Sequence, residues 1–365
     1  MLEHSEIKVK LLRLYLDRYL NVLTQSQYIG DIYVYDLFCG EGIYEDDGKG
    51  SPIVMLEAIK SIYFGNKAGG VATDKFHCSF NDISVSKVEN LQNEIRTRRL
   101  HYAEMGNLNF TAEDYRKLLP SVIEEINSFT KQKAFVFIDP YGYKDIRISD
   151  ISNLLQSRKS EVLLFLPTQF MFRFETKGTP ESLVEFIDEL MPVEQWPVSE
   201  TGIDFIQNLT EAFRNALGSS FFVDSFIITR NKNQFFCLFF FTSHIYGFDR
   251  MLDVKWQIDE EEGRGWRFDS GDSLFDQIEV KANTSRFERK LIDFLKVERT
   301  NAQLYEFRLH NGHLATHAYD ILKKLQAEGK LLSVKGDGTP ARKSAFYLDY
   351  KNYRDEPNKI KIKLR

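Results

Sequence analysis

The sequence is poor in cysteine and proline, and it contains no long hydrophobic run. Its 365 residues include only three cysteines and nine prolines. The cysteines are odd in number, lie far apart and form no Cys-x-x-Cys pair, which excludes a disulfide framework and predicts buried thiols in a reducing, cytoplasmic compartment. They are Cys39, Cys78 and Cys237. The most apolar run, FFCLFFF at residues 235–241, is too short to cross a bilayer, and the N-terminus lacks a signal-peptide pattern, so we expect no membrane partner.

A large excess of one charge is also missing when the whole chain is counted. The 48 Lys and Arg residues nearly balance the 53 Asp and Glu residues, which leaves a formal net charge of −5. The balance hides a division, because residues 281–365 hold 19 basic and 10 acidic residues, a net +9, whereas residues 1–280 hold 29 and 43, a net −14. An acidic body followed by a basic segment favours a polyanionic partner for that segment.

Short apolar runs alternate with helical periodicity over residues 30–170, after a leading amphipathic helix at residues 5–24. This alternation predicts an α/β fold with a doubly wound, mostly parallel sheet, whose ligands bind beyond the carboxyl ends of the strands. Residues 170–218 look like a helical insertion, and FFVDSFIITR and QFFCLFFFTSH flank an RNKN turn, so we expect the sheet to end in an antiparallel hairpin. The expected parallel strands are residues 32–38, 76–82, 101–105, 134–140 and 162–167.

The pattern changes near residue 285, where three short helices are followed by the runs LLSV and AFYL around a basic Gly/Pro tip, KGDGTPARKS. The second helix opens with a capping box at Thr300 and Gln303, and Gly329 ends the third. Three helices and a two-stranded wing predict a small winged-helix domain. We therefore expect a main domain at residues 1–285, a winged-helix domain at 286–350 and a basic tail at 351–365.

Basic side chains concentrate on the expected third helix and wing, where a solvated face is the alternative to contacts with nucleic-acid phosphates. The +9 balance favours the phosphate contacts. The candidates are Lys323, Lys324, Lys330, Lys335, Arg342 and Lys343. Histidines recur at helical spacing in the same region, but no cysteine or acidic cluster joins them, so we expect a solvated or phosphate-contacting face and no metal site. They are His310, His313 and His317.

The first candidate ligand loop follows the strand at residues 32–38 and reads DLFCGEG, with Asp36, Phe38, Gly40 and Gly42 as candidate cofactor-binding residues. Two glycines let the backbone approach a ligand closely. Four acidic residues against one lysine in residues 41–49 would repel a phosphate group. This favours a cationic cofactor without phosphate, S-adenosylmethionine, although a plain glycine turn would explain the motif as well.

Two further positions complete the expected cofactor site. Asp82 ends the strand at residues 76–82, where a carboxylate can accept hydrogen bonds from the ribose hydroxyls of an adenosyl group. Asn107 and Asn109, after the expected third strand, could reach the adenine ring. A surface Asn-Asp turn and an ordinary loop are the respective alternatives. Cys39 lies in the cofactor loop and is expected to be a buried thiol, not a nucleophile.

The third motif is Asp139-Pro140-Tyr141, directly after a continuous apolar strand, with a second tyrosine at position 143. A rigid Pro turn aims a carboxylate and a carbonyl into the cleft, and the following aromatic ring can stack on a flat base. These three residues are the candidate catalytic residues. The alternative is a strand-ending turn with Tyr141 packed in the core.

With these motifs in place, the sequence resembles the three-Cys-motif partner family of bacterial proteins, which is similar to class I S-adenosylmethionine-dependent methyltransferases. The segments that carry the resemblance are HSEIKVKLLRLYL, YDLFCGEGIYEDDGKGSPIVML, VFIDPYGY and NGHLATHAYDILKKLQAEGKL. The resemblance implies that Asp36, Gly40 and Gly42 form the cofactor loop, that Asp82 binds the ribose and that Asp139-Pro140-Tyr141 is the active-site motif of amino-group methyltransferases. It also implies a companion protein that bears a three-Cys motif.

One departure bears on the acceptor. Enzymes of this fold that methylate adenine N6 usually carry Asp-Pro-Pro-Tyr, whereas this chain has one proline, with tyrosines two and four positions after the acid. The leading hypothesis is therefore a methyltransferase that acts on an amino group in DNA or RNA. The alternative is a non-catalytic protein of the same fold that senses S-adenosylmethionine or a nucleotide and binds DNA or a partner.

Overall fold

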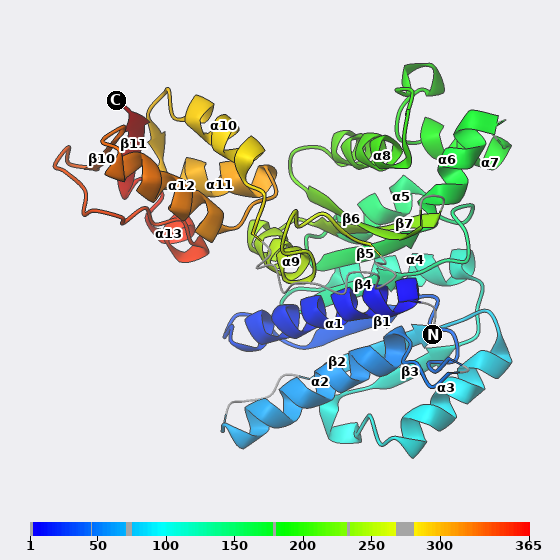
Figure 1. Ribbon diagram of the computed structural model, residues 1–365. Helices are drawn as coiled ribbons and strands as arrows, with labels where there is room; N and C mark the ends of the chain where they lie inside the picture. Colours follow the sequence, from blue (N-terminus) through cyan, green and yellow to red (C-terminus); the bar gives the residue numbers. More distant parts are fainter. Residues whose placement is uncertain (1–2, 45, 71–74, 178–179, 232–233, 268–280) are drawn as a thin grey trace, which may run out of the picture. The chain divides into compact units, whose positions relative to one another are not determined.

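The structure, a computed structural model, describes residues 3–44, 46–70, 75–177, 180–231, 234–267 and 281–365. The chain divides into two compact units (Figure 1). The large unit comprises Met1–Arg250 and Gly265–Ser270, and the small unit comprises Met251–Arg264 and Gly271–Arg365. The division therefore lies earlier than the expected boundary at residue 285, inside helix α9 (Ile245–Ile258). None of the described helices is long and apolar enough to cross a membrane.

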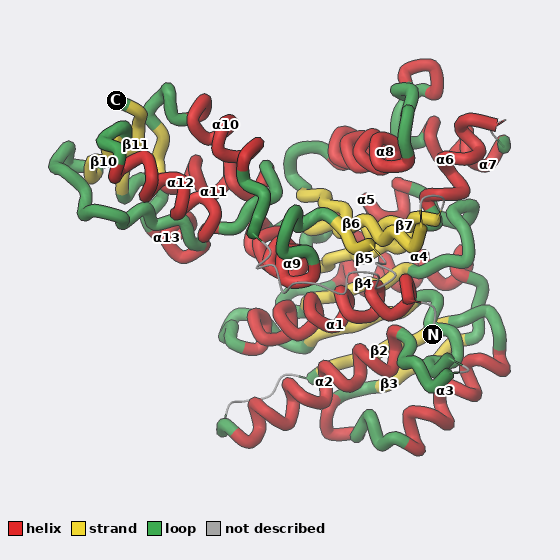
Figure 2. Tube along the Cα trace, in the orientation of Figure 1, coloured by secondary structure: helices red, strands yellow, loops and turns green. Residues whose placement is uncertain are grey.

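The large unit contains an eight-stranded sheet in the order β3-β2-β1-β4-β5-β7-β6-β8 (Figure 2). The five strands β1 to β5 pair in parallel, β7 is antiparallel to both β5 and β6, and β8 is parallel to β6. This confirms the predicted doubly wound, mostly parallel sheet that ends in an antiparallel hairpin. The strands are β1 Ile32–Asp36, β2 Phe76–Asn81, β3 Leu108–Thr111, β4 Lys133–Ile138, β5 Ser160–Leu166, β6 Phe222–Asn231, β7 Gln234–Thr242 and β8 Gly265–Arg267.

Helices cover both faces of this sheet, because alternate residues of the buried strands point to opposite sides. On one face Val136 and Ile138 of β4 join a buried cluster with α4, α5 and α8. On the other face the ring of Phe135 lies 6.0 Å from the ring of Tyr15 on α1. The helices are α1 Glu3–Thr24, α2 Ser51–Ala68, α3 Val85–Thr97, α4 Tyr115–Ser128, α5 Ile148–Leu155, α6 Thr168–Lys177, α7 Glu181–Asp188 and α8 Gly202–Leu217.

The expected third strand is displaced along the chain. Residues 101–105 form no strand; Ala103–Met105 is a single 3-10 turn, and β3 begins at Leu108. The side chain of Met105, at the end of this turn, is fully buried. An apolar residue at this position therefore reflects packing in the core and does not indicate a strand. Gly106 follows with φ +136°, where an added Cβ would lie 2.2 Å from the carbonyl oxygen of Phe76, so only glycine fits beside β2.

The small unit has its own core and a three-stranded antiparallel sheet in the order β10-β11-β9. The expected strand at residues 345–348 is wrong, because these residues form no strand in the structure. Phe346 and Leu348 are fully buried in the core, so the apolar side chains alternate as they would in a strand although the backbone pairs with no other strand. The partner of β10 is β11, which lies with a short helix in the expected basic tail. The elements are α10 Ser285–Phe294, β9 Arg299–Thr300, α11 Asn301–His310, α12 Ala315–Ala327, β10 Leu331–Lys335, α13 Tyr350–Asp355 and β11 Ile360–Leu364.

Candidate functional site

Three predicted carboxylates meet at the carboxyl edge of the parallel sheet. Asp36 is the last residue of β1, and Asp82 and Asp139 directly follow β2 and β4. Because β2, β1 and β4 are neighbours in the sheet and run in the same direction, their ends lie side by side. The structure thus brings together side chains that are up to about a hundred positions apart in the sequence.

The loop after β1 depends on two glycines with left-handed backbone conformations, Gly40 at φ +59° and Gly42 at φ +82°. A Cβ on Gly42 would lie 2.5 Å from Leu91 Cδ1 of α3, so the loop packs tightly against that helix. A Cβ on Gly40 would meet no atom within 4 Å. The loop is therefore closed at Gly42 and open at Gly40, which leaves room for a ligand beside the Gly40 backbone.

Asp82 holds this loop through its carboxylate. Oδ2 accepts a hydrogen bond of 3.1 Å from the Gly40 N–H, and Oδ1 accepts one of 2.9 Å from the Ser84 N–H. The residue is 2% exposed. Each carboxylate oxygen can accept a second hydrogen bond, so the residue can stabilise the loop and still bind a hydroxyl group of a ligand.

Asp36 is a fully buried carboxyl group whose pKa is raised to about 7. Burial is the largest cause, and the negative charge of Asp139 adds to it, whereas the Ser51 hydroxyl, the Phe38 N–H and Lys8 oppose it. Its Oδ1 accepts a hydrogen bond of 3.3 Å from the Phe38 N–H, while Oδ2 has no hydrogen-bond partner among the described residues. A buried carboxyl group in this state favours the arrival of a cation, which would stabilise its charged form.

The Asp139-Pro140-Tyr141 motif presents two polar groups and an aromatic ring at this edge. Pro140 is buried, and the Asp139 side chain is 19% exposed and forms an ion pair with Lys8 of α1. Tyr141 is 77% exposed, which contradicts packing in the core, and its hydroxyl accepts a hydrogen bond from Lys87. Tyr143 is the tyrosine of this segment that packs in the core.

Sequence reasoning missed Lys8, which is 5% exposed. Burial alone would lower the pKa of this ammonium group, but attraction to Asp139, Tyr44 and Asp36 raises it above its ordinary value. Lys8 therefore stays charged, and its positive charge is paired with the Asp139 carboxylate. A lysine in an amphipathic helix gives no sequence signal for this role, because most such lysines are solvated.

Asn81, the last residue of β2, was also missed although it organises the same edge. Its Nδ2 donates to the carbonyl oxygens of Leu37 and Glu113 at 3.2 and 3.0 Å. Its Oδ1 accepts from the Thr111 hydroxyl and the Glu113 N–H at 2.8 and 3.1 Å. The buried amide thus connects the segments that follow β1, β2 and β3 with all four of its hydrogen-bonding positions used.

Beyond β5, two buried polar side chains retain unused hydrogen-bonding capacity. Thr168 and Gln169 open helix α6 and are 0% and 5% exposed. The Thr168 hydroxyl and the Gln169 Oε1 have no hydrogen-bond partner among the described residues. Because β5 neighbours β4, these groups belong to the same edge as Asp139. Buried polar atoms without partners are costly, so a ligand that supplies N–H or O–H groups would be bound favourably here.

The remaining predicted cofactor residues fall in two places. The ring of Phe38, in the loop, lies 5.0 Å from the ring of Tyr115 at the start of α4. Asn107, by contrast, is exposed before β3, where its carbonyl accepts from the Cys78 N–H near the beginning of β2. This is the amino edge of the sheet, opposite the glycine loop, so the structure does not bring Asn107 together with the other candidate cofactor residues.

The three cysteines are free and buried, as predicted. Burial, with the charges of Asp36 and Asp82, raises the pKa of Cys39 far above its ordinary value, and burial raises that of Cys78 to about 12. Neither thiol is thereby suited to act as a nucleophile near neutral pH. Within the described parts of the chain, no group of three metal-ligating side chains is found.

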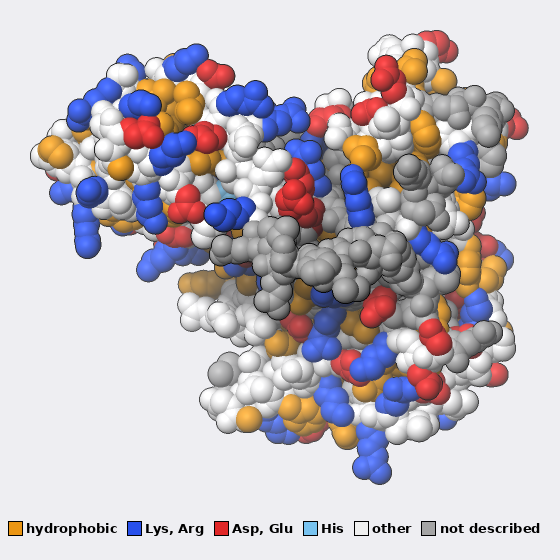
Figure 3. Space-filling view, in the orientation of Figure 1, with side chains coloured by type: hydrophobic (Ala, Val, Ile, Leu, Met, Phe, Trp, Pro, Cys, Tyr) orange, Lys and Arg blue, Asp and Glu red, His pale blue; other side chains and the backbone are white. Residues whose placement is uncertain are grey.

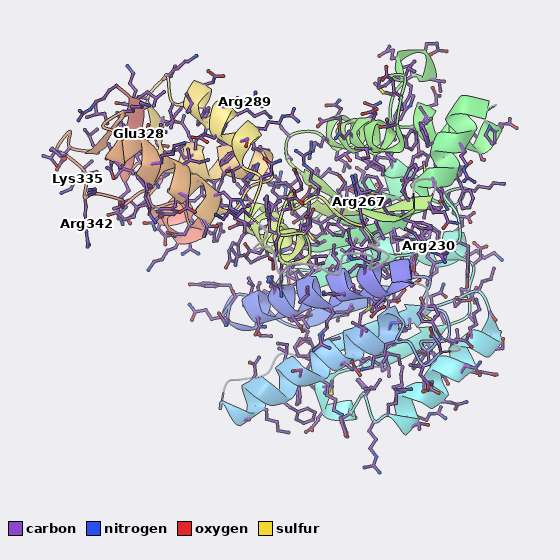
Figure 4. The ribbon with its side chains drawn as sticks, in the orientation of Figure 1. Arg230, Arg267, Arg289, Glu328, Lys335 and Arg342 are labelled. Carbon is purple, nitrogen blue, oxygen red and sulfur yellow. The ribbon has the colours of Figure 1, made fainter. Side chains whose placement is uncertain are left out.

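On the small unit, the predicted basic residues divide by their partners. Lys323, Lys335, Arg342 and Lys343 are exposed, and Lys335 and Arg342 project outward in Figure 4. Lys324 forms an ion pair of 2.8 Å with Glu288, and Lys330 one of 2.8 Å with Glu328. Lys and Arg side chains are spread over the visible face of this unit (Figure 3).

His313 differs from the expectation of a solvated or phosphate-contacting face. It is 9% exposed, and its ring stacks on that of Phe287 at 4.3 Å. Burial, reinforced by His317 and nearby cations, lowers its pKa to about 3. The residue is a neutral member of the core near neutral pH.

Two arginines of the large unit were not singled out from the sequence. Arg230 lies near the carboxyl end of β6, and Arg267 ends β8, which pairs with β6 in parallel (Figure 4). Since β6 and β8 run in the same direction as β5, both residues lie on the same edge of the sheet as the three carboxylates.

No protein-family model matches the chain, and no curated protein matches it. Among solved structures, a protein from Legionella pneumophila str. Philadelphia 1 is 12% identical, with a TM-score of 0.38, over 68% of this chain and 89% of its own. The O-methyltransferase from Bacillus cereus, in complex with SAH, is 9% identical, with a TM-score of 0.35, over 63% and 79%. The methyltransferase domain of bacterial CtHen1-C is 13% identical, with a TM-score of 0.31, over 64% and 98%.

Proposed function

We propose that the protein is an S-adenosylmethionine-dependent methyltransferase that acts on an amino group in nucleic acid. The observation that carries this proposal is the set of carboxyl groups Asp36, Asp82 and Asp139 at the ends of three neighbouring strands, beside a glycine loop that is open at Gly40. This edge is where folds of this class bind ligands. The resemblance to the three-Cys-motif partner family is part of the proposal and supports the same assignment.

The residues of the loop fit a cationic adenosyl cofactor. Asp36, with its unpartnered Oδ2 and raised pKa, would gain from a positive charge, and Asp82 retains the capacity to accept from a ribose hydroxyl. The half-buried ring of Phe38, which packs against the buried ring of Tyr115, offers aromatic surface near the start of α4. When bound, S-adenosylmethionine supplies a methyl group on a sulfonium sulfur; the acceptor nitrogen forms the new C–N bond as the S–C bond breaks, and the nitrogen's proton passes to solvent.

The acceptor side of the site is assigned to the groups beyond β4 and β5. Asp139 can accept an N–H of the amino group, which orients the nitrogen lone pair, and the exposed ring of Tyr141 can stack on a base. The unpartnered Oε1 of Gln169 would accept from a further N–H of the same base. These residues would orient the acceptor nitrogen, and orientation is a large part of what methyl transfer requires of a protein.

The small unit is proposed to hold the nucleic-acid backbone. Its elements follow the order α10, β9, α11, α12, β10, α13, β11, which is the order of a winged helix apart from the short helix α13 between the last two strands. The exposed Lys335, Arg342 and Lys343 lie at or beside the end of β10. Arg230 and Arg267 add positive charge at the edge of the large unit that carries the site. A companion protein with a three-Cys motif, implied by the resemblance, remains a proposed partner.

Calorimetry with S-adenosylhomocysteine tests the cofactor assignment. Gly40→Arg should abolish binding, because the position faces open space where the ligand is placed. Gly70→Arg is the matched control, since Gly70 also has a positive φ of +69° and no atom within 4 Å of an added Cβ. Binding that survives Gly40→Arg, or that is lost equally in Gly70→Arg, would refute the assignment.

The rival function, a non-catalytic sensor, is favoured by one observation, namely that Asp139 already has an internal partner in Lys8. Transfer of a labelled methyl group to DNA or RNA separates the two. The wild type should label nucleic acid, and Asp139→Ala should bind cofactor without labelling. A wild type that binds the cofactor but transfers no methyl group to either nucleic acid would support the sensor.

A further inference from the structure

We propose that Lys8 is a positioning residue that holds the Asp139 carboxylate in the orientation needed by the acceptor. This inference rests on the proposed function. It concerns the N-terminal helix, which the sequence presents only as an amphipathic helix that covers the sheet.

The spacing of two polar contacts places Lys8 at the carboxyl edge of the sheet. Tyr19 donates a hydrogen bond of 2.8 Å to the carbonyl oxygen of Ala134, near the beginning of β4, and Lys8 pairs with Asp139, just beyond its end. The eleven steps along the helix from Lys8 to Tyr19 span about 16 Å, and the five steps of extended chain from Ala134 to Asp139 also span about 16 Å. Helix α1 therefore runs antiparallel to β4, and the two spacings agree. Once Tyr19 is bound near the beginning of β4, Lys8 lies beside Asp139 at its end.

A second anchor fixes the same register halfway along the helix. Tyr15 donates its hydroxyl hydrogen bond to the buried carboxylate of Glu161 at the start of β5, and the Thr242 hydroxyl donates to the same carboxylate at 2.8 Å. Burial raises the pKa of Glu161, and these two donors oppose the shift. Two tyrosines thus hold α1 independently of Lys8, so loss of the lysine should leave the helix in place.

The two carboxylate oxygens of Asp139 differ in their contacts. Lys8 donates to Oδ2, and among the described residues no hydrogen bond reaches Oδ1. The side chain is 19% exposed, so one oxygen can be held from inside while the other meets the acceptor. The ammonium group also lies 4.7 Å from the centroid of the Phe165 ring, a cation–π contact that adds to its position beside Asp139.

The experiment compares Lys8→Met, Lys8→Arg and, as a matched control, Lys10→Met, which changes an exposed lysine of the same helix. Lys8→Met should lower the kcat for transfer of a labelled methyl group to DNA or RNA at least tenfold, while the Kd for S-adenosylhomocysteine changes less than threefold. Lys8→Arg should recover most of the turnover, and Lys10→Met should match the wild type. Wild-type turnover in Lys8→Met, or a loss of cofactor affinity as large as the loss of turnover, would overturn the proposal.

A double-mutant cycle tests the contact without any activity. The effects of Lys8→Met and Asp139→Asn on the unfolding equilibrium constant of the cofactor-free protein should be non-additive by at least threefold. Additive effects would overturn the pairing itself. If the wild type bound no S-adenosylhomocysteine, the proposed function would fail while the cycle still reported on the pair, so the two failures are distinguishable.

Discussion

The backbone N–H of Gly40 donates a hydrogen bond of 3.1 Å to Oδ2 of Asp82, across 42 positions of the sequence. The contact joins the glycine loop after β1 to the end of β2, and the second oxygen of the same carboxylate accepts from Ser84. The backbone N–H groups of Gly40 and Ser84 both need an acceptor, so position 82 requires a side chain with two acceptor oxygens.

Asp82→Asn should therefore disrupt the loop. An asparagine can accept from only one of the two N–H groups and turns its own NH2 toward the other, which should lower the free energy of unfolding by about 1–3 kcal/mol. Chemical denaturation measures this, and calorimetry should show weaker binding of S-adenosylhomocysteine. The control is Asp114→Asn, because the Asp114 carboxylate is a helix cap that accepts from Arg116 N–H, and asparagine caps equally well. Equal losses of stability in both variants would contradict the account.

Asn81→Ala should be among the most destabilising single changes in the large unit. It removes four hydrogen bonds inside a buried edge and leaves their partners unsatisfied, so we expect a loss of roughly 3 kcal/mol or more in the free energy of unfolding. Asn107→Ala, at the exposed amino edge, should change it by no more than about 0.5 kcal/mol. The comparison fails if the two variants unfold at the same denaturant concentration.

Asp36→Asn should separate stability from ligand binding. Because the folded pKa of Asp36 is about 7 and the unfolded value is near 4, the folded state holds a proton that the unfolded state has lost between these pH values. Stability is therefore lost as the pH rises from about 4 to 7, and the cost is fully present above the folded pKa. Removing the charge should stabilise the protein at pH 8 by on the order of 4 kcal/mol and have little effect near pH 4.

The same variant should bind S-adenosylhomocysteine or S-adenosylmethionine more weakly, with the larger loss for the sulfonium form. Thermal unfolding at pH 4, 6 and 8, followed by calorimetry, measures both quantities. A variant that is destabilised at pH 8, or that keeps full affinity for the cation, would show that Asp36 is not a buried charge that awaits a cationic ligand.

Lys323 and Lys324 are neighbours on α12, but only Lys324 has an ion-pair partner, Glu288, among the described residues. If the small unit binds nucleic-acid backbone, Lys323→Ala should reduce the slope of log Kd against log salt for duplex DNA by about 0.9. Lys324→Ala should have a smaller effect, because Glu288 already neutralises part of its charge. Fluorescence anisotropy from about 50 to 200 mM salt measures the slopes. Identical slopes in wild type and both variants would exclude this face as the contact surface.

The sheet and part of the site could be predicted from local patterns. Continuous apolar runs such as the one before Asp139 indicate strands buried on both faces, and an acid or a glycine that follows such a run must lie at the carboxyl edge. That rule located Asp36, Asp82 and Asp139. It failed for Asn107, because the strand expected at residues 101–105 is a turn, and the true strand begins after the asparagine.

Contacts between distant segments could not be predicted in this way. Lys8 meets Asp139 across 131 positions, through a helix register that depends on how α1 lies along β4. Asn81 looks like an ordinary strand residue in the sequence, but its four hydrogen bonds reach three residues, Leu37, Thr111 and Glu113, in two other segments. In the small unit, the alternation of Phe346 and Leu348 reports burial and does not reveal that β10 pairs with β11.

The path of the chain between the two units limits how they can be separated. The chain leaves the large unit after Arg250, returns to it at Gly265 to supply β8, and then enters the small unit again. No single cut can therefore free one unit whole. A chain that ends at residue 250 would lack β8 and leave β6 as an edge strand with unpaired backbone groups, which invites pairing with other molecules. Any exchange of the small unit between proteins would have to carry this strand of the large unit with it.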